Sequence, residues 1–417
     1  MNKLYKYRQL FENFFSLSIL NALNVLLPLV TLPYILHTVG KANYGAYSYV
    51  YTVLQYVILF STYGFNFSAT KQISQCREDK ETVSRIYNAV IACKSIIAVV
   101  LSMLLLLFSR IVFKDETGIL MFLYGLGMVV GDIFTPVWLF QGMEKMKYMT
   151  IVNASSKILF AILIFIVVRK QEDFDLLILL NSSGYLLAGL LSVILVYRQF
   201  HLGFHRTTFR DIVSQFKDGG AVFGSTFGMN LYRNANIIIL KQFVSDDLVG
   251  LYSAAEKVIK GFQSLISPVA QALFPHLSHR FKGQPVKNNM RLLRKISLPF
   301  TIVVAVVTIG VYIFAPTISD ILCGKEFVAC VPLIRIMTLV ILFGEINYLV
   351  GIVGLINMDG QVMFFRSVLL TGIFSVIFML LCAPCWGALA AAWAMSLSEL
   401  LLFLLCVLSL YHINKRE

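Results

Sequence analysis

Charged residues are scarce in this 417-residue chain: Asp, Glu, Lys and Arg make up only 14% of it, whereas 58% of the residues are hydrophobic. The mean hydropathy is +0.78, far above the balance of soluble globular domains. Long polar segments are missing too, since the longest connectors between apolar stretches, roughly 198–218 and 276–295, are too short for an independent domain. The composition therefore excludes a separate soluble domain and predicts an integral membrane protein.

Several chemical motifs are also missing. No GxxxxGK[ST] phosphate loop is present, which excludes ATP hydrolysis by that route. The six histidines lie near the ends of apolar stretches or in connectors, so we expect no buried metal site and no cofactor. Cys382 and Cys385 have redox-motif spacing but no thioredoxin-like context. Cys323 and Cys330 are candidates for a disulfide outside the membrane.

The chain contains about twelve apolar stretches. A membrane-spanning helix needs about 20 such residues, so the sequence predicts an all-α membrane protein. Six stretches precede the first long connector and six follow it, which indicates two six-helix lobes, residues 1–205 and 206–417, a common transporter plan. The predicted spans are 14–38, 44–67, 86–109, 118–140, 150–168, 176–197, 219–242, 249–275, 296–316, 328–355, 363–382 and 388–410.

Basic residues are distributed unevenly over the connectors. The two termini and the even-numbered connectors hold 22 Lys and Arg in or next to them, and the odd-numbered connectors hold 7. Because basic connectors stay inside the cell, we expect both termini in the cytoplasm. The net charge of +13 is thus mainly a topology signal. A nucleic-acid partner would need a basic folded surface, and we expect none.

Ten charged residues lie inside the predicted spans, when Lys241 and Arg366 near span ends are counted with the adjacent connectors. On insertion scales, each base near the bilayer centre costs about 2.5–3.5 kcal/mol, and such residues usually face the protein interior or water. They therefore mark a candidate pathway. The bases are Lys94, Lys157, Arg233, Lys257, Lys260 and Arg335, and the acids are Asp132, Glu256, Glu345 and Glu399.

Three of the bases are the leading candidates for binding an anion: Arg233, Lys257 and Arg335. Helical spacing places Asn230 and Asn234 on the same face as Arg233, where their amides add donors suited to phosphate or sugar oxygens. Arginine can bind phosphate in a bidentate manner and lysine acts as a point charge. The set predicts a substrate-binding site.

The other intramembrane bases have two interpretations each. Lys94 and Lys157 either join the binding site or extend toward the cytoplasmic interface. Lys260 is four residues after Glu256, a spacing that favours a structural ion pair on a helix, although Lys260 is also a candidate ligand.

The acids are candidates for ion coupling. Asp132, Glu399 and Glu256 could titrate during transport, and salt bridges are the alternative. Glu345 falls near a predicted span end, where we expect it at the membrane interface.

Four short blocks of sequence resemble polysaccharide-biosynthesis membrane proteins and, within that group, O-antigen (Wzx-type) flippases. The first two flank the second span, the third follows the fourth span, and the last joins the seventh to the eighth. They are Leu32–Gly40 with Tyr44–Gly45, Tyr63–Thr70, Pro136–Met146, and Asn234–Asn236 with Leu248–Lys257. The last four spans match mainly in hydropathy.

The resemblance implies the multidrug/oligosaccharidyl-lipid/polysaccharide (MOP) transporter fold, with two lobes around a central cavity and alternating access. The implied substrate is an undecaprenyl-diphosphate-linked oligosaccharide, turned from the inner to the outer leaflet of the bacterial plasma membrane. The implied partners are membrane lipids, a polysaccharide polymerase and a chain-length regulator. A proton gradient, a sodium gradient or the membrane potential would drive transport.

Two other functions fit a multi-pass membrane protein. An exporter of drugs or organic cations on the same fold would favour an acidic cavity, but intramembrane bases outnumber acids six to four. A membrane enzyme that processes glycans would need a catalytic loop or a His/Asp cluster at an interface, and the sequence has neither. We therefore expect a transporter and not an enzyme.

Overall fold

The structure is a computed structural model that describes the backbone of residues 2–203, 207–281 and 284–416, all of it helices and short connections without a strand. The expected all-α fold class is confirmed within those residues. The side chains that it does not describe are those of residues 1–22, 24, 25, 204–206, 221, 222, 225–227, 229–233, 272–276, 278, 279, 282, 283, 326, 416 and 417.

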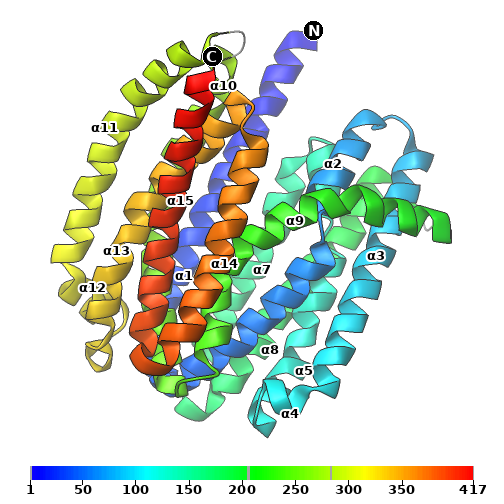
Figure 1. Ribbon diagram of the computed structural model, residues 1–417. Coiled ribbons are helices and arrows are strands. Elements are labelled where there is room, and N and C mark those ends of the chain that lie inside the picture. The colour runs from blue at the N-terminus through cyan, green and yellow to red at the C-terminus, as the bar shows by residue number, and fades with distance from the viewer. Residues whose placement is uncertain (1, 204–206, 282–283, 417) are drawn as a thin grey trace. The chain divides into compact units, whose positions relative to one another are not determined.

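Fifteen α-helices form the described chain, and they are labelled in Figure 1 where space allows. Short 3-10 or π-helical turns extend several of them: η1 (Gln171–Asp175) leads into α8, and η4 (Tyr348–Leu355) with η5 (Ile356–Met358) continues α13. The α-helices are α1 (Asn2–Thr62), α2 (Phe65–Gln75), α3 (Lys80–Leu107), α4 (Ser109–Val112), α5 (Glu116–Ile133), α6 (Val137–Gly142), α7 (Met146–Val167), α8 (Leu176–Leu195), α9 (Phe209–Leu240), α10 (Asp246–Phe281), α11 (Val286–Ile313), α12 (Ala315–Leu322), α13 (Cys330–Asn347), α14 (Gln361–Trp386) and α15 (Ala388–Arg416).

Eight helical segments in the described part of the chain are long and apolar enough to cross a membrane. They correspond to eight of the twelve predicted spans. The other four fall on α1, α9 and α10, which are not among those eight, so the number twelve stays a prediction. The eight are Lys80–Leu107, Glu116–Gly142, Met146–Val167, Gln171–Phe200, Val286–Ile313, Cys330–Met358, Gln361–Trp386 and Ala388–Lys415.

The chain forms two compact units. Unit 1 consists of Met1–Thr31 and Tyr49–Thr226, and unit 2 of Leu32–Ser48 and Phe227–Glu417. The division lies within α9 instead of at residue 205, and a piece of α1 belongs to the second unit. The two compact units therefore differ from the predicted lobes, 1–205 and 206–417, and the lobes stay a prediction.

A buried cluster at one end of unit 1 joins α2 to α6. Phe65, Trp138 and Phe140 are among its members and are almost completely buried. The Thr70 hydroxyl donates to the backbone carbonyl of Trp138 at 3.2 Å, so the two helices are also hydrogen-bonded. The second and third sequence blocks of the family resemblance therefore pack against each other.

In unit 2, the first and fourth sequence blocks of the family resemblance also pack against each other, through glycines. The backbone of α1 turns at Gly40, whose φ of 76° is the left-handed region that glycine adopts most easily. Beyond it, a side chain on Gly45 would collide with the backbone carbonyl of Asp246, and one on Gly250 with that of Lys41. The two backbones can approach this closely only because both positions are glycine.

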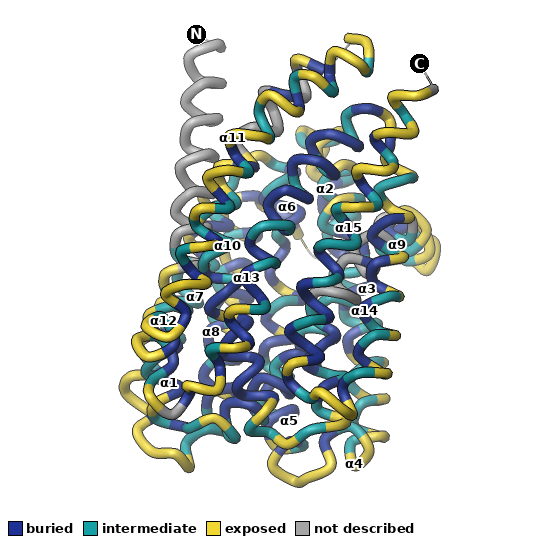
Figure 2. Tube along the Cα trace, turned by 60° about the vertical axis from the view of Figure 1, so that its left-hand side comes forward, coloured by how far each residue is buried: buried dark blue, intermediate teal, exposed yellow. Residues whose placement is uncertain are grey.

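The remaining helices of unit 2 differ in how deeply they are enclosed. Figure 1 shows α11, α13, α14 and α15 running side by side. The segment Cys330–Met358 is the most enclosed, with 67% of its most apolar window buried, and Val286–Ile313 is the least, with 17%. Figure 2 shows the exposed face of α11 along its length. A lipid environment suits that apolar face.

The expected disulfide outside the membrane is not present. Cys323 and Cys330 are both free and buried. The Cys330 thiol donates instead to the carbonyl of Leu251 at 3.2 Å. The cysteines thus act as small apolar residues in the packing of unit 2.

Gly250→Ala tests the close approach of α1 and α10. We expect it to lower the free energy of unfolding by about 1–3 kcal/mol, the usual result of inserting a methyl group into a tightly packed site. Gly310→Ala is the matched control, since a side chain there would meet nothing within 4 Å. Thermal unfolding of the purified protein measures both, and equal stability of the two variants would contradict the packing argument.

Candidate functional site

Among the described residues of unit 1, a deeply buried ion pair joins α3 to α5. Lys94 is 2% exposed, and its Nζ donates to the Asp132 carboxylate at 2.8 Å and to the Asp132 backbone carbonyl at 2.7 Å. That carbonyl lies in the last turn of α5, where it also accepts from the backbone N–H of Thr135 at 3.2 Å and where the helix dipole favours a cation. Lys94 therefore does not extend to an interface, and Asp132 is neutralised by it.

A second polar group lies in unit 2, on α9 and α10. Lys260 forms an ion pair with Glu256 at 2.9 Å, as the four-residue spacing predicted, and donates to the Asn234 side chain at 3.1 Å. The Glu256 side chain is 8% exposed and that of Lys260 is 40% exposed. The structure thus holds one ammonium in place while leaving part of the lysine side chain accessible.

The other candidate bases are more dispersed. Lys257 is exposed on α10, Lys157 is half-buried on α7, and Arg335 is exposed on α13. The Arg335 guanidinium lies over the ring of Tyr312 on α11, 5.4 Å from its centroid, a cation–π arrangement. Arg233 and Asn230 lie outside the residues whose side chains are described.

Two carboxyls are buried in the middle of unit 2. Glu399 on α15 is 1% exposed and accepts a hydrogen bond from Asn347 at 2.7 Å. Glu345 on α13 is 3% exposed and accepts one from Ser267 on α10 at 2.7 Å. The interfacial position expected for Glu345 is wrong, because Glu345 is buried and lies near the middle of the helical segment Cys330–Met358.

The absence of a side chain at Gly344 lets Gln263 and Glu399 pack close to α13. A side chain there would collide with the amide of Gln263 and lie 3.8 Å from the carboxyl carbon of Glu399. Sequence analysis did not identify Gln263, Ser267 or Asn347. The one available signal was the spacing of Glu345 and Asn347 within an apolar run. In the described residues, no group of three or more His, Cys, Asp or Glu could hold a metal ion.

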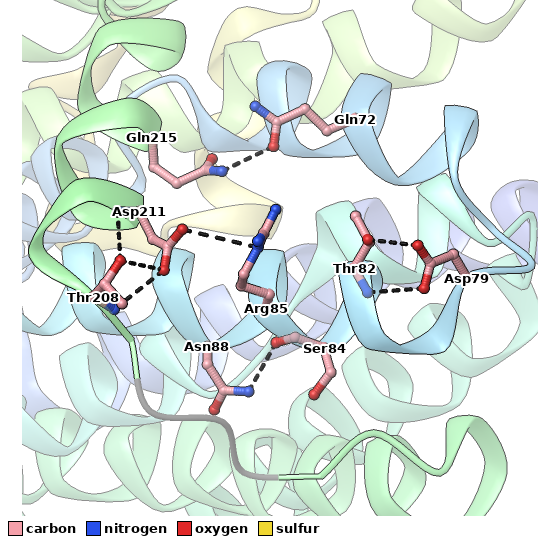
Figure 3. A network of polar contacts seen from close by, with 9 residues as sticks. All are labelled: Gln72, Asp79, Thr82, Ser84, Arg85, Asn88, Thr208, Asp211 and Gln215. Atoms are coloured by element: carbon pink, nitrogen blue, oxygen red, sulfur yellow. Dashed lines mark hydrogen bonds and ion pairs between the residues drawn. The ribbon is translucent and has the colours of Figure 1, made fainter.

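A polar pocket lies in unit 1 between the starts of α3 and α9, which we call the α3–α9 pocket. In Figure 1 the first turns of α9 run across the axis of α3. Figure 3 shows Arg85 pointing toward Asp211, and Gln215 toward Gln72. The Asp79 side chain caps α3 by accepting from the backbone of Thr82 at 3.1 Å. Sequence analysis missed this pocket because its residues resemble ordinary capping residues.

Comparison with known families gives a match over most of the chain. The family model described as "polysaccharide biosynthesis protein" matches residues 10–281. A protein of Escherichia coli (strain K12) proposed to be an O-antigen transporter is 30% identical over 298 residues, which cover 70% of this chain and 72% of that protein. A protein of Shigella dysenteriae with the same description is 25% identical over 316 residues, 76% of this chain and 78% of that protein.

Solved structures with the same fold cover nearly the whole chain. The lipid II flippase MurJ, in an inward closed conformation, matches with a TM-score of 0.75 over 98% of this chain and 90% of its own. An inward-facing multidrug resistance transporter of the MATE family in the MOP superfamily matches with a TM-score of 0.71 over 97% and 99%. Each is 13% identical to this chain, so these likenesses show the fold alone.

Lys94→Met tests the buried ion pair. We expect it to lower the free energy of unfolding by about 3 kcal/mol, because it leaves the Asp132 carboxylate without its counter-charge. The double variant Lys94→Met/Asp132→Asn should recover most of that loss, and Lys71→Met, at an exposed lysine on α2, should have little effect. Thermal unfolding measures all three, and additive losses in the double variant would show that the two groups do not interact.

Proposed function

The chain belongs to the polysaccharide biosynthesis protein family, and from that premise we propose that it is a flippase for lipid-linked oligosaccharides. It moves undecaprenyl-diphosphate-linked repeat units from the cytoplasmic to the outer leaflet for the synthesis of a surface polysaccharide, by alternating access. The names of its relatives, O-antigen transporters, support this substrate class. Transport involves no catalytic step, so the chain is not an enzyme.

The observation that carries the proposal is the partly exposed side chain of Lys260 on α10. A diphosphate carries about two negative charges and needs cations held in position. Glu256 and Asn234 hold Lys260 while its side chain stays 40% exposed. The neighbouring helical positions Lys257 and Arg233 would complete the site, and Asn230 would add an amide donor.

The other bases take different parts in the proposed mechanism. Lys94 is neutralised by Asp132, so its function is to hold α3 against α5 and not to bind diphosphate. Lys157 and Arg335 stay candidate ligands at other stages of the passage. Among the described residues, Lys260 contacts both Asn234 and Glu256.

The membrane potential would favour this direction of transport. Moving one unneutralised negative charge outward across an inside-negative membrane is favoured by about 2.3 kcal/mol per 100 mV. This requires the protein to lie in the plasma membrane with both termini in the cytoplasm, as the basic connectors predict. A polysaccharide polymerase and a chain-length regulator would take up the product, with membrane lipids as surroundings.

An ion gradient can supply further free energy through a buried carboxyl. Asp132 and Glu256 are both in ion pairs with lysines, which ties them to structural roles. Glu399 is 1% exposed and accepts from a neutral amide, that of Asn347. We assign proton coupling to Glu399, the more deeply buried of the two carboxyls described above in unit 2; Glu345 lies on α13, the helix that carries Asn347. The same carboxyls are the feature that would suit an organic-cation exporter, the second candidate function.

Lys257→Ala and Arg233→Ala test the diphosphate site. Because a charge-assisted hydrogen bond contributes about 1.5–3 kcal/mol, each should reduce surface polysaccharide about tenfold or more, with the lipid-linked intermediate accumulating in the inner leaflet. Leaflet-resolved detection of that intermediate is the measurement. Lys325→Ala, at an exposed connector lysine, is the control. Normal export in both variants, inserted at normal levels, would remove the site, and normal export without the gene would favour the cation exporter.

Glu399→Gln tests coupling. The substitution keeps an oxygen for the Asn347 hydrogen bond but cannot take up a proton. In reconstituted vesicles with an imposed pH gradient, we expect the wild type to be accelerated by the gradient and the variant to be indifferent to it. Acceleration by the same factor in both proteins would exclude Glu399 as the coupling group.

A further inference from the structure

The α3–α9 pocket has no part in the mechanism above. Its larger portion has a volume of about 600 Å³, and an adjoining portion of about 230 Å³ shares Thr82, Arg85, Asp211 and Ser214 with it. These volumes suit a small-molecule ligand. The larger portion is lined by Glu81, Thr82, Arg85, Thr208, Arg210, Asp211 and Ser214, and the smaller adds Gln72, Ile86, Ala89 and Gln215.

A chain of hydrogen bonds fixes the direction of one buried amide in this pocket. Gln72 donates its amide to the Asp218 carboxylate at 2.9 Å and keeps its oxygen for Gln215. Gln215 therefore donates to Gln72, also at 2.9 Å. Gln215 is only 6% exposed, and its Oε1 is buried with no hydrogen-bond partner in the described structure. An unmet buried acceptor calls for a donor from a ligand.

The charges that line the pocket balance each other. Arg85 and Arg210 offer guanidinium donors, and Glu81 and Asp211 offer carboxylate acceptors. Arg85 Nε lies 3.8 Å from the Asp211 carboxylate. A hydrogen bond from the Thr208 hydroxyl, 2.7 Å long, holds the pKa of Asp211 below its usual range, so this carboxyl is ionised at neutral pH. The lining thus offers donors and acceptors without a net charge.

This combination selects the chemistry of the ligand. A phosphate brings acceptors, which would face two carboxylates and the unmet oxygen of Gln215. A sugar brings hydroxyls, each of which donates and accepts, so one ring can donate to Gln215 and Asp211 while it accepts from Arg85. The hydroxyls of Thr82 and Ser214 extend the same pattern.

We propose that the α3–α9 pocket binds sugar residues of the transported oligosaccharide, separately from the site that holds its diphosphate. The inference rests on the proposed function for the identity of the sugar. It is supported by topology, because the connectors around both helix starts are among those predicted to be cytoplasmic, the side on which the glycan starts. The pocket then contributes to the choice of glycan, while the bases on α9 and α10 recognise the lipid diphosphate common to all such substrates.

Binding of the free oligosaccharide tests the pocket without transport. The probe is the repeat-unit oligosaccharide released by mild acid from the host's own lipid-linked intermediate, titrated against the full-length protein in lipid nanodiscs. We expect saturable binding that Gln215→Leu weakens about fivefold or more, the change expected when one hydrogen bond is lost. Ser214→Ala, at an exposed position, should weaken it less and leave the melting temperature unchanged. Gln171→Leu, at an exposed glutamine of η1, should bind as the wild type does.

Four outcomes are decisive. Weaker binding by Gln215→Leu, and to a smaller degree by Ser214→Ala, with both proteins folded, supports the pocket. Equal binding by both variants and the wild type overturns it, as does displacement of the sugar by inorganic phosphate. Absence of any saturable binding also overturns it and assigns the Gln215 oxygen to a water molecule. The leaflet assay separates the two proposals: a wild type that binds the sugar but moves no intermediate contradicts the function and leaves the pocket standing.

Discussion

The cost of leaving charge unneutralised in an apolar environment constrains this whole structure. Helices that cross a membrane can carry lysine or glutamate only where another group meets the charge. Lys94 therefore fixes α3 against α5 through Asp132, and Lys260 fixes α10 against α9 through Asn234. The same contacts that lower the cost of a charge also select which helices are neighbours. Function then depends on the few polar groups that this arrangement leaves accessible.

The sequence blocks that reveal the family are mostly packing residues. Phe65 and Trp138 belong to one buried cluster of unit 1, and Gly45 and Gly250 line the backbone crossing in unit 2. Such residues report a shared fold, because close packing tolerates few replacements. They say little about the glycan. A pocket with accessible polar groups, such as the one around Gln215, is where related transporters can differ.

Local patterns were predictable from the sequence and long-range pairings were not. Apolar runs predicted the helices, and spacing predicted the contact of Glu256 with Lys260, because both signals lie within one helix. Nothing in the sequence links Lys94 to Asp132, since spacing carries no information about which helices pack. Glu345 was misplaced because its burial depends on a contact with another helix, the hydrogen bond from Ser267 on α10. The hydrogen-bond chain through Gln72 and Gln215 depends on the crossing of α9 over α3, which only the structure provides.

Because Leu32–Ser48 belongs to unit 2, this early segment must wait during synthesis for the later helices on which it packs. This segment leaves the ribosome about 200 residues before α10, the helix on which it packs, and translation at about 5–20 residues per second makes that an interval on the order of 10–40 s. During it, the surfaces around Gly45 have no native partner to contact. Unit 2 thus contains one of the first helices to be made but is the last part of the molecule to be completed. Insertion machinery must therefore tolerate, or shield, an unfinished helix pair for about half of the time that the 417-residue protein takes to be synthesised.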